Sequence, residues 1–189
     1  MATTQQAICR HFATLFSYPG SEVRPVAAEC LELLRTSCPG AAEPLRSFVA
    51  FLAAQEAARV EELFTATFDL QPACHPYVGY QLCGESQQRT MFLIKLQQLY
   101  HQHGFTAGTE LPDHLGTMLR FLGTVNDCNC CEELVSDGLL PSLAKMLPGV
   151  SDGEHPYVNL LKALQNFLSE TVASDGRLSV VPRSQEECL

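Results

Sequence analysis

Apolar residues recur with the spacing of an α-helix along almost the whole of this sequence. In the first such segment, the positions that share one helical face are Ile8, Phe12, Leu15 and Phe16. The Pro-Gly pairs of "SYPG" at 17–20 and "SCPG" at 37–40 interrupt the pattern, and they bound a second segment with the same period. No two segments alternate polar and apolar residues as neighbouring strands would. The sequence therefore predicts an all-α fold.

The middle of the chain continues this pattern. Residues 41–68 predict one long helix, or two with a break near 54–58. The stretch "DLQPACHPYVGYQLCGES" at 69–86 has no sustained period and predicts a long ordered loop. Ser86 is expected to cap the next helix, which ends near Gly104, and its wide apolar coverage predicts a central position in the fold.

The last third of the chain adds three helical segments. The first has an apolar stripe made of Leu115, Met118, Leu119 and Leu122. Residues 131–147 form a second helix that Gly138 and Pro141 must bend or split, and residues 156–172 form the third. We expect a single-domain helical bundle of about seven to nine helices over residues 1–174. A flexible C-terminal tail is expected over 175–189.

Charge and hydropathy limit the partners and the location of the protein. Its net charge is −9, from 12 Lys and Arg against 21 Asp and Glu, so nucleic acid is not an expected partner. A basic partner is favoured, although an acidic surface that only keeps the protein soluble explains the charge equally well. No run of apolar residues is long enough to cross a membrane, and the N-terminus lacks a signal-peptide pattern. We expect a cytoplasmic protein without stable membrane insertion.

The cysteines and histidines do not form a recognisable metal motif. Nine scattered cysteines, an odd number, are typical of reduced thiols in a cytosolic protein. The segment "DCNCCEE" places three thiols at 128, 130 and 131, but adjacent cysteines do not easily bind one tetrahedral ion. His101 and His103 are two apart on a helix end and point in different directions. We predict no metal site and no cofactor.

Two short polar segments are candidates for function. In "ELPDHL", Asp113 is expected to cap a helix, and the alternative is that Asp113 and His114 hold a neighbouring segment or a ligand. Glu85 and Arg89 have the spacing of an i,i+4 ion pair at the start of a helix. Common hydrolase, zinc-protease and nucleotide-binding motifs are absent from the sequence, which weakens any catalytic hypothesis, and no catalytic residue is predicted.

Taken together, these two segments resemble a known family. "FDLQPACHPYVGYQLCGESQQRTMFLIKLQQLYHQHGF" followed by "ELPDHLGTMLRFLG" is similar to the NarJ family, the delta subunit or assembly chaperone of respiratory nitrate reductase, within the wider TorD and DmsD group of molybdoenzyme chaperones. The resemblance is strongest over residues 60–123, and "LFSYPG" near the N-terminus also matches. Cys83 stands where the family usually has His, and Thr90 where it often has Gly. The client enzyme therefore stays open, with nitrate reductase as the first candidate.

The resemblance implies an all-helical chaperone without catalysis of its own. Such a protein binds the N-terminal peptide of a molybdoenzyme catalytic subunit, a basic and partly apolar segment, and keeps the apoenzyme competent for insertion of its molybdenum cofactor. The partner-binding residues that it implies divide into groove walls (Tyr77, Tyr80), acidic contacts (Glu85, Asp113) and side chains that hold those acids in place (Arg89, His114).

Two other classes of function remain open from the sequence. One is a small helical adaptor with an unrelated partner, which would show no preference for basic peptides. The other is a metal-handling protein that uses Cys74, Cys83 and the cysteines at 128–131. For the chaperone we expect a monomer or a weak homodimer.

Overall fold

The computed structural model describes residues 3–70, 74–150 and 155–175. The fold is all-α, as predicted, and the described residues contain no strand. Helices that follow one another without interruption can be counted as one, and the described part of the chain then has nine, in agreement with the predicted bundle. The segment 176–189, which makes up nearly all of the predicted tail, lies outside the described residues. Asp175 is the last residue of the final helix.

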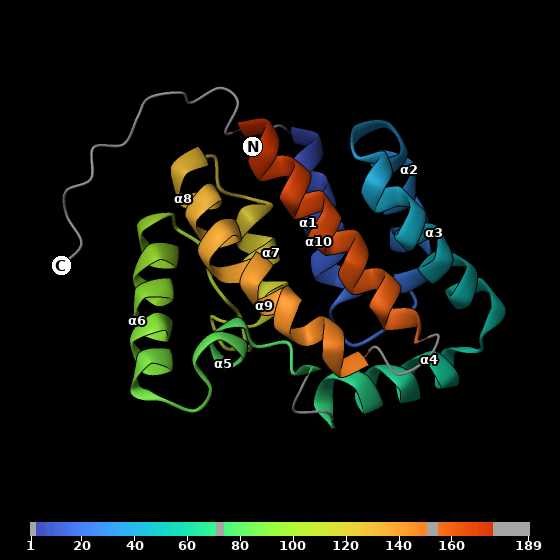
Figure 1. The fold of residues 1–189 in the computed structure, drawn as a ribbon, viewed down its shortest axis with the longest axis horizontal. Coiled ribbons are helices and arrows are strands. Elements are labelled where there is room, and N and C mark those ends of the chain that lie inside the picture. The colour runs from blue at the N-terminus through green and yellow to red at the C-terminus, as the bar shows by residue number, and fades with distance from the viewer. Residues whose placement is uncertain (1–2, 71–73, 151–154, 176–189) are drawn as a thin grey trace.

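Four helices from the two ends of the described chain pack together as one part of the bundle (Figure 1). They are α1 (Thr3–Leu15), α2 (Val23–Ser37), α3 (Pro39–Ala54) and α10 (Pro156–Asp175). α10 packs along α3, and α2 packs against both α1 and α3. The two Pro-Gly interruptions lie where α1 and α2 end. At the second, Pro39 begins α3 at a position that needs no backbone N–H.

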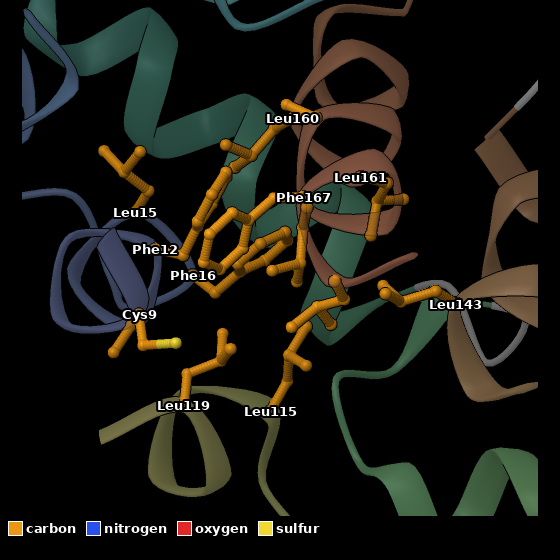
Figure 2. Packing of buried hydrophobic residues seen from close by; sticks show 14 of the residues in the cluster. Cys9, Phe12, Leu15, Phe16, Leu115, Leu119, Leu143, Leu160, Leu161 and Phe167 are labelled. Atoms are coloured by element: carbon orange, nitrogen blue, oxygen red, sulfur yellow. The ribbon is translucent and has the colours of Figure 1, made fainter. Parts of the chain in front are cut away.

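The apolar face predicted for the first helix points into the core. Its four residues, Ile8, Phe12, Leu15 and Phe16, are all buried. Figure 2 shows Phe12 of α1 and Phe16, the residue after that helix, meeting Phe167 of α10, with Leu115 and Leu119 beneath them. The rings of Phe12 and Phe167 stack with centroids 5.9 Å apart. Side chains from both ends of the chain therefore share one core, which makes the described helices one folding unit.

The predicted break in the segment 41–68 is present. α3 ends at Ala54, and α4 (Ala57–Phe64) begins after two residues and continues into a π-helical turn, Thr65–Asp69. Phe64 and Phe68 from this run meet the buried ring of Tyr157 at centroid distances of 6.0 and 5.0 Å. These aromatic contacts fix α4 against the start of α10.

The segment 69–86 is not the continuous loop that the sequence predicted. It contains a short helix, α5 (Val78–Cys83), in which Val78 and Gly79 are buried. Six residues are too few for a helix to form alone in water, so tertiary contacts must stabilise α5. This is why its sequence has no helical period that can be recognised.

The helix after Ser86 begins and ends as predicted but lies elsewhere in the fold. The hydroxyl of Ser86 accepts a hydrogen bond from the backbone N–H of Arg89 at 3.3 Å, and α6 (Gln87–Gln102) is followed by Gly104 with φ of 64°. Only Leu96 and Tyr100 of α6 are buried. Figure 1 shows α6 at the edge of the molecule beside α5, so the predicted central position was wrong.

The remaining helices close the bundle. α7 (Leu115–Leu122) buries the predicted leucine and methionine stripe and packs against α1. The next helix is irregular near Gly138 and Pro141 but continuous: α8 (Cys128–Glu133) runs into a π-helical segment, Leu134–Leu139, and then into α9 (Leu140–Met146) and a 3-10 turn, Leu147–Val150. Pro141 stands in the first turn of α9, where its missing N–H costs least.

Candidate partner-binding site

The two segments singled out in the sequence meet in the fold. The backbone N–H of Val78 donates to the carbonyl of Asp113 at 2.8 Å, and the N–H of Leu115 donates to the carbonyl of Pro76 at 2.7 Å. These bonds make a single antiparallel bridge between Tyr77 and His114. The "HPYV" and "PDHL" segments, far apart in sequence, therefore lie side by side between α5 and α7.

Asp113 is fully buried and does not cap α7. Its Oδ2 accepts a hydrogen bond from Nε of Arg89 at 3.1 Å, while Oδ1 has no partner among the described residues. The cap is His114, whose Nδ1 accepts a hydrogen bond from the N–H of Gly116 at 3.1 Å. The predicted helix start is thus confirmed, but the predicted capping residue was wrong by one position, because the carboxylate turns inward to the guanidinium.

Arg89 is the centre of the cluster. Besides Asp113, its guanidinium donates to Oε1 of Glu85 at 2.9 Å, which confirms the predicted i,i+4 pair. The side chain of Arg89 is 12% exposed and that of Glu85 is 79% exposed. The rings of Tyr77 and Tyr80 lie against the guanidinium, with centroids 5.6 and 5.7 Å from Cζ. Arg89 therefore links α6, α5 and the residue before the α7 cap.

Gly79 allows these side chains to come together. A Cβ atom at this position would lie 2.8 Å from Oδ2 of Asp113 and 2.9 Å from a ring carbon of Phe92. Both distances are far shorter than a normal van der Waals contact. The glycine in "HPYVGY" is therefore explained by the close approach of α5 to the ion pair.

His114 faces Tyr77 and stays neutral near pH 7. Burial lowers its pKa, while the carboxylates of Glu110 and Asp113 act in the opposite direction. Its ring meets that of Tyr77 edge to face at 5.4 Å. Since Nδ1 accepts the capping hydrogen bond, the proton of the neutral ring is on Nε2.

A cleft of about 530 Å³ opens beside Tyr77 and His114; we call it the Tyr77–His114 cleft. Phe16 and Phe64 contribute apolar wall, and Thr117 contributes a buried hydroxyl that has no hydrogen-bond partner within the described ranges. Asp69 and Glu110 are exposed and belong to the lining. Neither carboxylate forms an ion pair with a described residue. The cleft thus combines aromatic walls with two exposed carboxylates.

Arg120 also lines the cleft, and its guanidinium contacts other groups of the chain. The guanidinium donates to the carbonyl of Ala107 and lies against the ring of Phe105, with Cζ 5.6 Å from the centroid. Arg120 keeps its positive charge, so Asp69, Glu110 and Arg120 together give the lining an excess of one negative charge.

All six predicted site residues fall in one neighbourhood, but only two of them line the cleft. Tyr77, Tyr80, Glu85 and Asp113 contact Arg89, and His114 joins through Tyr77. Of the six, Tyr77 and His114 line the cleft. A partner cannot touch Asp113 directly, because the residue is 0% exposed.

Sequence reasoning did not assign a role to several residues that line the cleft. Asp69 and Glu110 are part of the segments that carry the resemblance, and Tyr18 belongs to "LFSYPG". Their place in those segments was the available signal. Thr117 and Arg120 also belong to such a segment, but their approach to the cleft depends on how α7 packs.

The described thiols and imidazoles do not gather into a site. Among the described residues, no group of three or more His, Cys, Asp and Glu side chains could hold a metal ion. Burial raises the pKa of Cys74 to about 12 and that of Cys130 to about 11, so both thiols are protonated near pH 7. The side chain of Cys128 lies outside the described residues. Within the described helices, none is long and apolar enough to span a membrane.

Comparisons with known proteins point to one family. Residues 34–174 match the family model described as nitrate reductase delta subunit. The chain is 31% identical over 121 residues to a Bacillus subtilis protein described as a nitrate reductase molybdenum cofactor assembly chaperone, NarJ, and the match spans 63% of this chain and 66% of that relative. The crystal structure of a redox enzyme maturation protein from Archaeoglobus fulgidus is similar with a TM-score of 0.59 and 20% identity, over 87% of this chain and 93% of the other. That likeness concerns the fold alone.

Proposed function

The chain belongs to the nitrate reductase delta subunit family, and from that membership we propose that it is a maturation chaperone for a molybdoenzyme, without catalysis of its own. It binds the N-terminal segment of the catalytic subunit and keeps the apoenzyme competent for insertion of the molybdenum cofactor. Respiratory nitrate reductase is the proposed client, and the cytoplasm, where the subunit is made, is the proposed place of action. The chaperone acts as a monomer or a weak homodimer.

One observation carries the assignment of the site: the Tyr77–His114 cleft has an apolar wall and two exposed carboxylates, Asp69 and Glu110, that form no ion pair with a described residue. A basic and partly apolar peptide fits this combination. Burial of its apolar side chains supplies most of the affinity, and the rim charges supply orientation and a faster encounter.

The six residues of the predicted site then have different roles. Tyr77 and His114 form part of the binding wall, and Tyr80 and the exposed Glu85 extend it toward α6. Asp113 and Arg89 are positioning residues, because their buried ion pair holds the wall in place. This changes the role first expected for Asp113, which acts through Arg89 and not by contact with the client.

Calorimetry with synthetic peptides tests this function. The probes are the N-terminal peptides of the molybdoenzyme catalytic subunits encoded in the same genome. We expect one of them to bind with micromolar or tighter affinity. The double variant Asp69→Lys, Glu110→Lys should weaken that binding by about tenfold or more, since it reverses both rim charges.

The matched control is Glu29→Lys, Glu32→Lys on α2, which changes the net charge by the same amount at exposed positions outside the cleft. It should bind the peptide about as well as the wild type. Equal weakening by both double variants would show a general charge effect and count against the cleft. If no peptide binds the wild-type protein, the chaperone function is wrong and a helical adaptor with another partner takes its place.

A further inference from the structure

A second hollow lies between α6 and the run formed by α8 and the π-helical segment; we call it the α6–α8 groove. Its volume is about 420 Å³, within the range of about 300–1,000 Å³ that is typical of ligand sites. Its apolar lining consists of Leu82, Phe92, Leu96, Leu99 and Leu134. All of these except Leu96 are only half-buried, so the chain itself leaves apolar surface uncovered at the groove. The groove has no lining residue in common with the Tyr77–His114 cleft.

The charges at the groove are distributed unevenly. Glu133 and Asp137 are exposed on the α8 side, and Lys95 is exposed on the α6 side. None of the three forms an ion pair with another described residue. A ligand with positive charge is therefore attracted to one edge and repelled from the other, which gives the groove a preferred orientation for a basic peptide.

The backbone also favours a helical ligand in the groove. Gly138 belongs to the lining and presents no side chain there. It lies in the π-helical segment Leu134–Leu139, and single π turns within helices are frequent at functional sites. Two helical walls with apolar side chains between them are the usual receptor for the apolar face of an amphipathic helix.

We propose that the α6–α8 groove binds the apolar face of an amphipathic helix within the client's N-terminal segment, with Lys or Arg side chains of that helix next to Glu133 and Asp137. This inference rests on the proposed chaperone function. It adds a second contact surface, because α5 leads from Tyr77 at the cleft to Leu82 at the groove. A client segment bound at both places is held by two separate sets of contacts.

The charges argue against a second copy of the chain as the occupant. Two copies of the chain, each with net charge −9, repel each other, and in a symmetric dimer that paired this groove with itself the four acidic side chains of the two linings would outnumber the two Lys95 side chains. A basic peptide meets no such repulsion. The peptide is therefore the better electrostatic match.

A gain of affinity gives the sharpest test, because a misfolded variant cannot produce it. Lys95→Glu removes the only described positive charge in the groove lining and should strengthen binding of the client peptide by about threefold to tenfold. The matched control is Lys162→Glu at an exposed position on α10, which changes the net charge equally. It should leave the affinity within about twofold of the wild type.

A double-mutant cycle, with one change in the protein and one in the peptide, tests the apolar contact between Leu99 and the peptide. Leu99→Asp should weaken binding of the unmodified peptide by about tenfold. A second peptide, in which Ser replaces the apolar residues and the basic residues are kept, should bind weakly and equally to the wild type and to this variant. Circular dichroism establishes that the variant is folded. If Leu99→Asp fails to fold, the Lys95→Glu measurement decides alone.

The outcomes separate this inference from the proposed function. Tight peptide binding that is indifferent to Lys95→Glu and Leu99→Asp would overturn the groove assignment and leave the chaperone function standing. No peptide binding to the wild type would overturn both. Concentration-dependent dimerisation of the wild type that Leu99→Asp abolishes would also overturn the assignment, since a second copy would then fill the groove.

Discussion

Arg89 and Asp113 form a buried ion pair, with Nε of the arginine 3.1 Å from Oδ2 of the aspartate. The pair joins the first turn of α6 to the residue immediately before the cap of α7. It also decides the orientation of the "ELPDHL" segment, since Asp113 turns toward the guanidinium and leaves the capping position to His114. An acid-histidine sequence thus serves two structural purposes at adjacent positions.

Removal of one partner of this pair should destabilise the protein strongly. Asp113→Ala leaves Arg89 buried without its main counter-ion, and we expect the free energy of unfolding to fall by about 3–5 kcal/mol. Glu85→Ala removes the exposed partner of the same arginine and should cost about 1 kcal/mol or less. Urea denaturation of both variants measures the difference, and equal losses would contradict the central position of Asp113.

Two glycines offer a matched comparison of packing. Gly79→Ala places a Cβ atom 2.8 Å from Oδ2 of Asp113 and 2.9 Å from Phe92, and should destabilise the fold by about 1–3 kcal/mol. Gly138→Ala meets its nearest atoms at 3.7 and 3.8 Å, an ordinary contact, and should be neutral or slightly stabilising. Thermal unfolding of the two variants checks this. A neutral Gly79→Ala would mean that α5 can move away from the ion pair.

Stability should fall as the solution becomes acidic. Burial lowers the pKa of His114, so below the unfolded-state pKa of about 6.5 the unfolded chain binds more protons than the native one. The contribution of neutral His114 to the free energy of unfolding is fully present above that pH. It is lost as the pH falls toward the lowered pKa of His114 in the native protein. The free energy of unfolding, measured by urea denaturation between about pH 5 and pH 8, should decrease over this window.

His114→Asn is the control for this titration, because asparagine keeps a side-chain oxygen that can accept the hydrogen bond from Gly116. The pH dependence should become shallower but should not disappear, since burial also lowers the pKa of His11 and His155. An unchanged slope of the free energy of unfolding against pH would show that His11 and His155, and not His114, account for the effect.

The described thiols should differ sharply in reactivity. Cys83 is exposed, whereas Cys9, Cys38 and Cys74 are buried and burial raises the pKa of each to about 12. Iodoacetamide near neutral pH should therefore modify Cys83 in the native protein and the other three only after unfolding. Peptide mass mapping reads the result, with Cys83→Ser as the control. Native labelling of Cys74 would contradict its burial.

Much of the fold could be predicted because local sequence patterns determine it. The faces of α1 and α7 follow directly from apolar spacing, and the residues after α1 and after α2 contain the Pro-Gly breakers that end them. α6 was different. Its own apolar side chains point to several sides of the helix, and Met91 is 50% and Ile94 41% exposed. Periodicity shows that a helix has apolar surface but does not show what covers that surface.

The site was predictable as a set of residues and not as a geometry. The resemblance brought the six residues together, and four of them contact Arg89, which is itself one of the six. It could not indicate that Asp113 is buried or that Asp69 and Glu110 provide the available negative charge. Such distinctions depend on tertiary packing between segments distant in the chain, which spacing within one segment does not contain.

The bridge between Tyr77 and His114 has a consequence for evolution and engineering. Because the N–H of Leu115 donates to Pro76 and the N–H of Val78 donates to Asp113, the segment that contains α5 and α6 begins and ends at the same place in the bundle. A segment whose two ends are adjacent can change in length with little strain on its host, as domain insertions do. We therefore expect that the segment between 78 and 113 can be exchanged as one unit. A transplanted segment would carry α6, and with it one wall of the α6–α8 groove, to a new core.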